Sequence, residues 1–443
     1  MRIQLSEHFT FKKLLIFVLP SIIMMVSVSV YSVVDGLFVS NFAGKEAVAA
    51  INLIFPLIIV TGSIGFMFGA GGSALVSKTM GEGDKERANA YFSFIVYVTA
   101  IIGVVIACAG QFIVPPVAKL LGAKGKTYEY CVLYGRILLA GQPFYILQNV
   151  FQSFFVAAEK PRLGLIITMT AGLTNIVLDA AFIAGAKWGL TGAAVATLIG
   201  EIVGGVLPII YFTCKNNSLL RLTKTHFYGK ALLKSATNGS SEFLSNVSAA
   251  VVMMLYNFQI QRIVPGDDGI AAYGAIGYVM MIFFSIFMGY AVGSAPLIAF
   301  NYGAENEAEL KNLFRKSLII TVIAGVLMTG LSEALAYPII KLFGFDGELF
   351  DMTLRGFRIY ALAFLLTGFS VFGSSLFTAL NNGLISALIS FLRTLVFQIA
   401  AVMLLPLLWK LDGVWSAICF AEAASIMVTV IFVLCFRKRY KYA

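Results

Sequence analysis

The chain has 443 residues, of which 59% are hydrophobic and only 12% are charged, with a mean hydropathy of +0.90. Soluble globular domains average about 25% charged residues, so this composition excludes a soluble protein and indicates a polytopic membrane protein. The net charge of +10 comes mostly from short segments between apolar runs, so it predicts no nucleic-acid partner. The five cysteines lack the spacing of a metal site or a disulfide framework, and we expect no cofactor.

Twelve apolar runs are long enough to cross a bilayer, which takes about 20 helical residues. They cover residues 14–39, 48–77, 90–114, 131–157, 163–185, 190–213, 236–262, 270–300, 317–338, 357–379, 384–408 and 413–436. Only a few residues separate the fourth run from the fifth and the tenth from the eleventh, which predicts two tight helical hairpins. The predicted fold is an all-α polytopic membrane protein with twelve transmembrane helices.

The Lys and Arg residues between these runs predict how the chain is oriented in the membrane. Most of the 32 basic residues fall on one side, together with both ends of the chain. Basic loops stay in the cytoplasm, although the loop with Lys119, Lys124 and Lys126 falls on the opposite side. We therefore expect a multi-pass protein of the inner (plasma) membrane with both termini in the cytoplasm.

An internal repeat relates the two halves of the chain at a shift of 222 residues. Pro116 coincides with Pro338 and Arg136 with Arg358, and the order and spacing of six apolar runs agree. Six is an even number, so the halves have the same orientation and an axis along the membrane normal relates them. We predict two pseudo-symmetric six-helix bundles, residues 1–213 and 235–443, joined by a basic cytoplasmic linker, residues 214–234. A cleft between such bundles is typical of alternating-access transporters; the alternative is a duplicated scaffold.

The first half contains polar residues that the second half lacks at matching positions. Asn175 and Asp179 lie four residues apart in an apolar run, so they share one face of the predicted helix. A charge at membrane depth is unfavourable by roughly 3 to over 10 kcal/mol, and it persists where it faces a cavity, a partner or an ion. The matched positions are Asp35 and Asn257, Asn175 and Phe397, and Asp179 and Ala401. This asymmetry predicts a cation site in the first half.

Depth along the helices groups these residues at one level. At 1.5 Å per residue, Asp35 and Asp179 lie roughly 30 and 24 Å from the inner ends of their helices, and Thr197 lies roughly 10 Å below an outer end. Carboxylate, amide and hydroxyl oxygens suit a hard cation such as Na⁺, whereas paired, desolvated carboxyl groups suit H⁺. The predicted cation-coupling residues are Asp35, Asn175, Asp179 and Thr197. The choice of ion stays open, and Asp35 alone could instead cap its helix.

Other polar side chains within the apolar runs are candidates for lining a substrate cavity. They are Gln148, Asn149, Gln152, Glu201, Glu242, Asn257 and Arg393. Glu201 could instead pair with a basic group, and the amides could hydrogen-bond neighbouring helices. Arg393 is expected to hold a carboxylate or free carbonyl groups inside the second bundle. Arg136 and Arg358 are expected to extend their charged ends to the membrane surface.

With these residues in view, the chain resembles the multidrug and toxic compound extrusion (MATE) family over nearly its whole length. The segments that carry the resemblance are Val34–Val39, Asn175–Asp179 and Gly189–Thr197. The resemblance implies two six-helix lobes, with a cation site in the first lobe formed by Asp35, Asn175, Asp179 and Thr197. It also implies export of amphipathic, usually cationic drugs in exchange for H⁺ or Na⁺.

Two other functions fit the sequence less well. A lipid-linked oligosaccharide flippase shares the two-lobe design, but it needs a basic cavity, and the runs contain few basic residues beyond Arg393, Arg136 and Arg358. A membrane-embedded enzyme would need a nucleophile–base pair or a metal cluster, and the sequence shows no HExxH motif and no histidine within a run. We therefore expect a non-enzymatic antiporter whose partners are small amphipathic molecules and the lipid bilayer, acting as a monomer.

Overall fold

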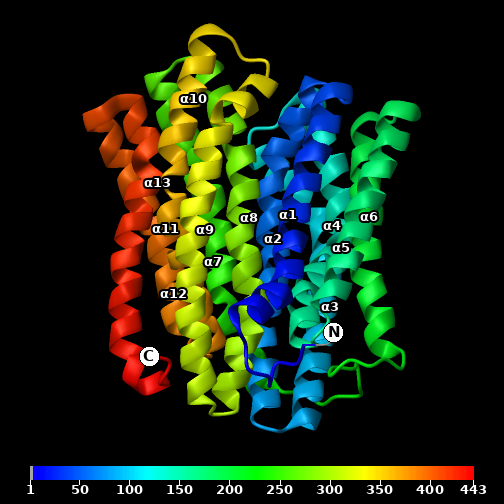
Figure 1. The fold of residues 1–443 in the computed structure, drawn as a ribbon. Coiled ribbons are helices and arrows are strands. Elements are labelled where there is room, and N and C mark those ends of the chain that lie inside the picture. The colour runs from blue at the N-terminus through cyan, green and yellow to red at the C-terminus, as the bar shows by residue number, and fades with distance from the viewer. Residues whose placement is uncertain (1–2) are drawn as a thin grey trace.

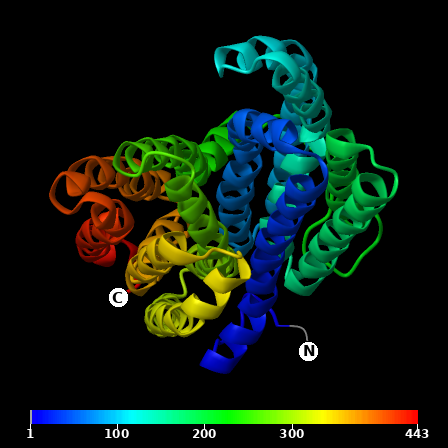
Figure 2. The ribbon, with the colours of Figure 1, turned by 90° about the horizontal axis from the view of Figure 1, so that it is seen from above.

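The computed structural model describes residues 3–443, which are mostly helical. The first half forms α1 (Phe11–Phe42), α2 (Lys45–Gly81), α3 (Lys85–Leu120), α4 (Gly125–Ala157), α5 (Pro161–Asp179), the π-helix η1 (Ala180–Gly185) and α6 (Gly189–Thr213). The second half forms α7 (Gly229–Ile263), α8 (Asp268–Gly303), α9 (Glu307–Leu342), α10 (Gly347–Ala361), α11 (Phe364–Ala379), α12 (Gly383–Phe391), the π-helix η2 (Leu392–Val396) and α13 (Phe397–Tyr440). The two halves form two bundles that lie side by side, with both termini at the same end (Figure 1; Figure 2).

These elements make twelve crossings, as the sequence predicts. Within the described residues, nine helices are long and apolar enough to span a membrane, and the bent pair α10–α11 makes a tenth. The helix α4, which is less apolar because it includes Lys126, Glu129 and Arg136, adds one more. The last helical segment contributes two crossings, because α13 joins two helices at Lys410, whose φ is 48°. The division into domains at residues 213 and 235 stays a prediction; α7 begins at Gly229.

The prediction of the tenth span as one helix over residues 357–379 is wrong, because the helix begins earlier and is interrupted by a bend. The helical segment begins at Gly347 and bends by 46° between α10 and α11. At the bend, the N–H groups of Leu365 and Leu366 bond to carbonyl oxygens three residues earlier rather than four. Such bonds tighten the helix locally, and hydropathy alone does not reveal them. The other helices extend past the predicted ends by up to ten residues, as at Glu307 of α9, because they continue beyond the apolar core.

The repeat is visible in the backbone. The turn between α4 and α5 contains Glu159 with a φ of 58°, and the matching turn between α11 and α12 contains Asn381 with a φ of 57°. Gly83 and Glu305, which also match, have φ values of 90° and 52° after α2 and α8. Left-handed residues are uncommon outside glycine, so their recurrence at matching positions confirms two pseudo-symmetric bundles.

The bundles share a core only near the end that holds the termini. Within residues 3–443, the largest cluster of buried hydrophobic residues draws on both bundles and includes Leu5 and Tyr442. A second cluster lies in the second bundle around Trp415, and a third lies in the first bundle around Ile54. The bundles are therefore closed against each other at the termini end and have separate cores towards the opposite end.

A close crossing of α2 and α8 joins the bundles on their pseudo-two-fold axis. A Cβ atom at Gly81 would collide with the carbonyl oxygen of Phe300, and one at Gly303 would collide with that of Lys78. Residues 78 and 81 match residues 300 and 303 in the repeat, so the contact is symmetric. Only glycine allows two helix backbones to approach this closely.

The same closeness recurs where α2 crosses α7. A Cβ atom at Gly71 would collide with the carbonyl oxygen of Ser235, and one at Gly239 would collide with that of Met67. We call Gly71, Gly81, Gly239 and Gly303 the glycine seam. At the seam the helices touch through their backbones. This contact leaves no backbone N–H or C=O group unsatisfied, because these groups are already hydrogen-bonded within each helix.

The segment before α1 also joins the bundles at the termini end. The N–H group of Leu5 donates to Glu159 Oε1 at 2.8 Å, in the turn between α4 and α5 of the first bundle. The N–H group of Phe9 donates to Glu309 Oε1 at 3.0 Å, and Lys316 Nζ donates to the carbonyl oxygen of Phe9 at 2.5 Å, both on α9 of the second bundle. Leu5 and Phe9 are fully buried.

The glycine seam makes a stability prediction. Replacing Gly303 with Ala should lower the free energy of unfolding by about 1–3 kcal/mol, because the added methyl group overpacks the α2–α8 crossing. The thermal unfolding temperature of the protein in detergent micelles measures this effect. Gly274→Ala on the same helix is the control, since nothing lies within 4 Å of its added Cβ, and alanine there favours the helix by up to about 1 kcal/mol. Equal unfolding temperatures for the two variants would contradict a tight seam.

Candidate functional site

Asp35 and Asp179 face each other inside the first bundle. Asp35 lies on α1 and Asp179 is the last residue of α5, and these two helices pack together with the two side chains in contact. Asp179 is fully buried, and neither of its carboxyl oxygens receives a hydrogen bond; the buried Oδ1 of Asp35 also lacks a partner. Two carboxylates at this spacing repel each other and lose their hydration, so the pair requires a positive charge between them.

Asn175 and Thr197 lie beside this pair. Asn175 is buried one turn before Asp179, and its Nδ2 donates to Thr197 Oγ1 of α6 at 3.4 Å. Gly200 allows the contact, because its backbone lies against Asn175, with 3.1 Å from an added Cβ to the Asn175 Cβ. The structure thus brings Asp35, Asn175, Asp179 and Thr197 together from α1, α5 and α6. These four residues have the oxygen donors that a proton or a small hard cation needs.

A π-helix begins directly after Asp179. Residues Ala180–Gly185 form η1, with Asp179 as its N-terminal flanking residue. A π-turn widens the helix by one residue and is common at functional sites. In the second bundle η2 occupies Leu392–Val396, which does not match η1 in the repeat. The local backbone at the two sites therefore differs along with the side chains.

Three tyrosines near the carboxyl groups were missed by the sequence prediction. Tyr134 of α4 is buried within electrostatic range of Asp35 and Asp179, and Tyr31 of α1 lies close to Asp35. Tyr145 lies further along α4, across Gly62 of α2. The spacing of Tyr31 and Asp35, four residues apart on one helix face, was a signal that could have found one of them.

Glu201 lies inside the first bundle rather than in a substrate cavity or an ion pair, which corrects both expectations for it. It is 8% exposed, and an added Cβ at Gly141 of α4 would lie 2.5 Å from its Oε2. That oxygen has no hydrogen-bond partner. Glycine at position 141 lets the α6 side chain turn towards α4 instead of the space between the bundles.

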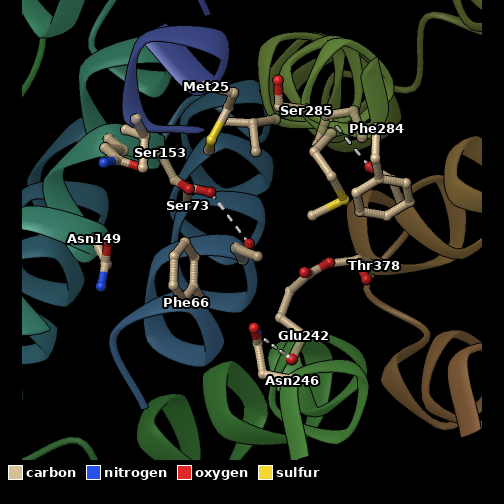
Figure 3. A pocket seen from close by; sticks show the side chains of 18 of the residues that line it. Met25, Phe66, Ser73, Asn149, Ser153, Glu242, Asn246, Phe284, Ser285 and Thr378 are labelled. Carbon is tan, nitrogen blue, oxygen red and sulfur yellow. Dashed lines mark hydrogen bonds between the residues drawn. The ribbon is translucent and has the colours of Figure 1, made fainter. Parts of the chain in front are cut away.

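A cavity of about 260 Å³ lies between the two bundles. Figure 3 shows Met25, Phe66 and Asn149 of the first bundle opposite Glu242 and Phe284 of the second. Gln152, Asn246 and several methionines and serines complete its wall. Ala70 and Ser73, which lie on either side of Gly71 of the seam in the sequence, also line it, so the cavity borders the seam at Gly71. Its surface is mostly apolar with a few polar groups, as in many small-molecule sites.

Three of the seven predicted cavity residues line this space, namely Asn149, Gln152 and Glu242. Gln148 does not, because it points towards α6, where its side chain lies against Gly204. Asn257 does not either; it is half-buried on α7, fifteen positions beyond Glu242, which is about 22 Å along the helix. The prediction for these two residues was wrong because polarity in an apolar run does not determine the helix face.

Arg393 lines a second cavity, of about 270 Å³, within the second bundle. Its Nε donates to Glu422 Oε1 at 2.8 Å, and both side chains are buried. The guanidinium also lies over the ring of Phe284, 5.6 Å from its centroid. Phe284 and Met281 line both cavities and therefore form the partition between them. Arg393 holds a carboxylate, which is the structural role expected from the sequence.

The two matched arginines lie near the surface. Arg136 Nε donates to the carbonyl oxygen of Gln111 at 3.1 Å. Arg358 is about half exposed and lies 3.5 Å from Glu333. Both positions agree with side chains that extend out of the apolar core.

Comparison with known proteins gives a family match in both halves. The family model described as MatE matches residues 20–181 and residues 243–404. The two matches fall in the two bundles and begin at nearly equivalent positions of the repeat.

Relatives match over almost the whole chain. The multidrug export protein MepA of Staphylococcus haemolyticus is 27% identical over 436 residues, covering 98% of this chain and 95% of that protein. The protein of the same name from Staphylococcus saprophyticus is 24% identical over 437 residues, covering 97% and 94%. A solved structure described as the outward-facing conformation of a multidrug resistance MATE family transporter of the MOP superfamily superposes with a TM-score of 0.92. It is 23% identical and covers 99% of this chain and 98% of that chain, so it shows the shared fold.

The Arg393–Glu422 pair makes a prediction about stability. Arg393→Met should destabilise the protein by about 3–5 kcal/mol, because it leaves the Glu422 carboxylate buried without a partner. The double variant Arg393→Met, Glu422→Met should recover most of this loss. Thermal unfolding in detergent measures both variants.

The exposed pair Arg355–Asp412, at 2.5 Å, is the matched control. Arg355→Met should change stability by less than about 1 kcal/mol, because exposed ion pairs contribute little. A single Arg393 variant as stable as this control would show that Glu422 does not depend on the arginine.

Proposed function

This chain belongs to the MATE (MatE) family, and we propose that it exports small amphipathic, mostly cationic molecules in exchange for inward H⁺ or Na⁺. The observation that supports this most directly is the Asp35–Asp179 pair, in which both carboxyl oxygens of Asp179 and Oδ1 of Asp35 are buried without a hydrogen-bond partner. A site of this kind binds a cation or proton strongly when it is closed to water and releases it when hydrated.

The cavity between the bundles supports an amphipathic substrate. Met25, Met281, Met288 and Phe284 give it flexible apolar walls, which adapt to ligands of different shape. Glu242 adds a negative charge at one side of the cavity. Drug export is the activity in the name of the MepA relatives, and this cavity suits such cargo.

Coupling requires that the cation and the substrate favour different states of the transporter. In the proposed cycle the substrate leaves from the state seen here, in which the bundles are closed at the termini end. Cation binding at Asp35 and Asp179 then favours the state that opens towards the termini end. The basic residues at that end suggest that it faces the cytoplasm.

The composition of the cavity favours drug export over flipping of a lipid-linked oligosaccharide. A pyrophosphate needs several Lys or Arg side chains around it. The charged residue in the wall of the central cavity is an acid, Glu242, and Arg393 is engaged by Glu422. Such a cavity would repel a pyrophosphate and attract a cation.

The central test of the proposal is Asp179→Asn. The variant should fold normally but lose cation-coupled export, because one of the two charges that hold the cation is gone. Transport into proteoliposomes, with H⁺ and Na⁺ gradients imposed separately, measures the coupling and identifies the ion. Asp351→Asn, at an exposed position of α10, should transport like the wild type. Export by Asp179→Asn at the wild-type rate would refute the site.

Glu242 makes a prediction about substrate charge. Glu242→Gln should weaken the binding of a monovalent organic cation such as tetraphenylphosphonium about tenfold, equivalent to about 1.4 kcal/mol. Binding of an uncharged amphipathic molecule should be unaffected. Equilibrium binding to the detergent-solubilised protein measures both ligands, with the exposed Glu348→Gln as control. An equal loss for charged and uncharged ligands would mean that Glu242 only shapes the cavity.

A further inference from the structure

Glu201 is a third carboxyl group inside the first bundle, and the four-residue cation site does not include it. It lies four residues after Thr197 on α6, so the two side chains share a helix face and are separated by about 6 Å along the axis. Its Oε2 is buried without a hydrogen-bond partner. Among residues 3–443, no Lys, Arg or His forms an ion pair with it.

These surroundings fit a protonated carboxyl group. An ionised carboxylate that is buried without a donor or a counter-charge is strongly disfavoured, whereas the neutral acid is tolerated. The backbone of α4 at Gly141 lies directly against the group, so there is little room for a hydrated metal ion at this oxygen. A proton is the cation that fits.

Three tyrosines lie within electrostatic range of Glu201. Tyr134 of α4 is within electrostatic range of Glu201 and of both Asp35 and Asp179. Tyr145, also on α4, lies close to Glu201 and to Asn149, and Asn149 lines the central cavity.

Tyr31 of α1 is the third titratable neighbour of Glu201. The tyrosines of α1 and α4 thus place hydroxyl groups near Glu201, with the cavity residue Asn149 close to Tyr145 and the Asp35–Asp179 pair close to Tyr134. A hydroxyl group can pass a proton on by donating one while it accepts another.

We propose that Glu201 is a proton-carrying station between the central cavity and the Asp35–Asp179 pair, and that it loses its proton to the cavity when a cationic substrate binds. This inference rests on the proposed function and deepens it by adding a second site of cation exchange. Glu201 gives up one proton through the Tyr145 hydroxyl to the cavity beside Asn149 and becomes a carboxylate. It is restored when Tyr134 donates a proton to it and takes one from the side of the pair.

Measuring proton release on substrate binding tests whether Glu201 gives up a proton when a cation binds. The full-length protein in detergent, in a weakly buffered solution with a pH-sensitive dye, receives saturating tetraphenylphosphonium. Glu201→Gln should release about one proton fewer per bound cation than the wild type. Glu201→Asp, which keeps a carboxyl group, should release as many as the wild type, and so should the exposed Glu348→Gln. Equal release by Glu201→Gln and the wild type would overturn the proposal.

An infrared measurement without substrate tests the protonated state directly. The C=O stretching band of protonated carboxyl groups should lose intensity in Glu201→Gln relative to the wild type at neutral pH. Glu201→Met, which has an apolar side chain of similar length, gives the same test if the amide disturbs folding. An unchanged band would overturn the proposal even if the substrate assay failed.

The two proposals fail in different ways. If Asp179→Asn loses coupled export while Glu201→Gln releases the full number of protons, the cation site stands and the station at Glu201 does not. If Asp179→Asn exports normally while Glu201→Gln releases one proton fewer than the wild type, the role of Glu201 is retained and the assignment of the Asp35–Asp179 pair as the cation site is wrong.

Discussion

The close approach of helix backbones at the glycine seam is the constraint on which the rest of the structure depends. Gly81 and Gly303 bring α2 and α8 together on the pseudo-two-fold axis, and Gly71 and Gly239 do the same for α2 and α7. Because the helices touch here, the bundles share one hydrophobic cluster at the termini end and keep separate clusters at the other. The cavity between the bundles borders the seam at Gly71, between Ala70 and Ser73. Side chains larger than hydrogen at these four positions would separate the bundles and fill or reshape that cavity.

The backbone is close to symmetric, whereas the chemistry of the two bundles is not. Matching turns contain Glu159 and Asn381 in the same left-handed conformation. The first bundle nevertheless buries carboxyl groups without basic partners, while the second neutralises Glu422 with Arg393. An unpaired buried carboxyl group gains most from a proton or cation, and a paired one gains least. The two bundles are thus suited to different tasks within one repeated fold.

The sequence predicted those features that depend on hydropathy, spacing and repetition. Twelve crossings follow from apolar runs, and the grouping of Asp35, Asn175, Asp179 and Thr197 follows from helix depth and face. The bend at Leu362–Ala363 and the π-helices η1 and η2 depend on the hydrogen-bond register of packed helices, which composition does not encode. The direction of Glu201 and Gln148 depends on small residues in neighbouring helices, Gly141 and Gly204, and these contacts need the three-dimensional packing.

The segment before α1 has a consequence for the order in which the protein assembles. Phe9 leaves the ribosome well before its partner, Glu309, which is 300 positions later in the chain. At about 5–20 residues per second, synthesis of that stretch takes roughly 15–60 s. During this interval the segment cannot make its native bonds to α9, even if the first bundle is already inserted. The termini end therefore closes late in biogenesis, after the second bundle has provided α9.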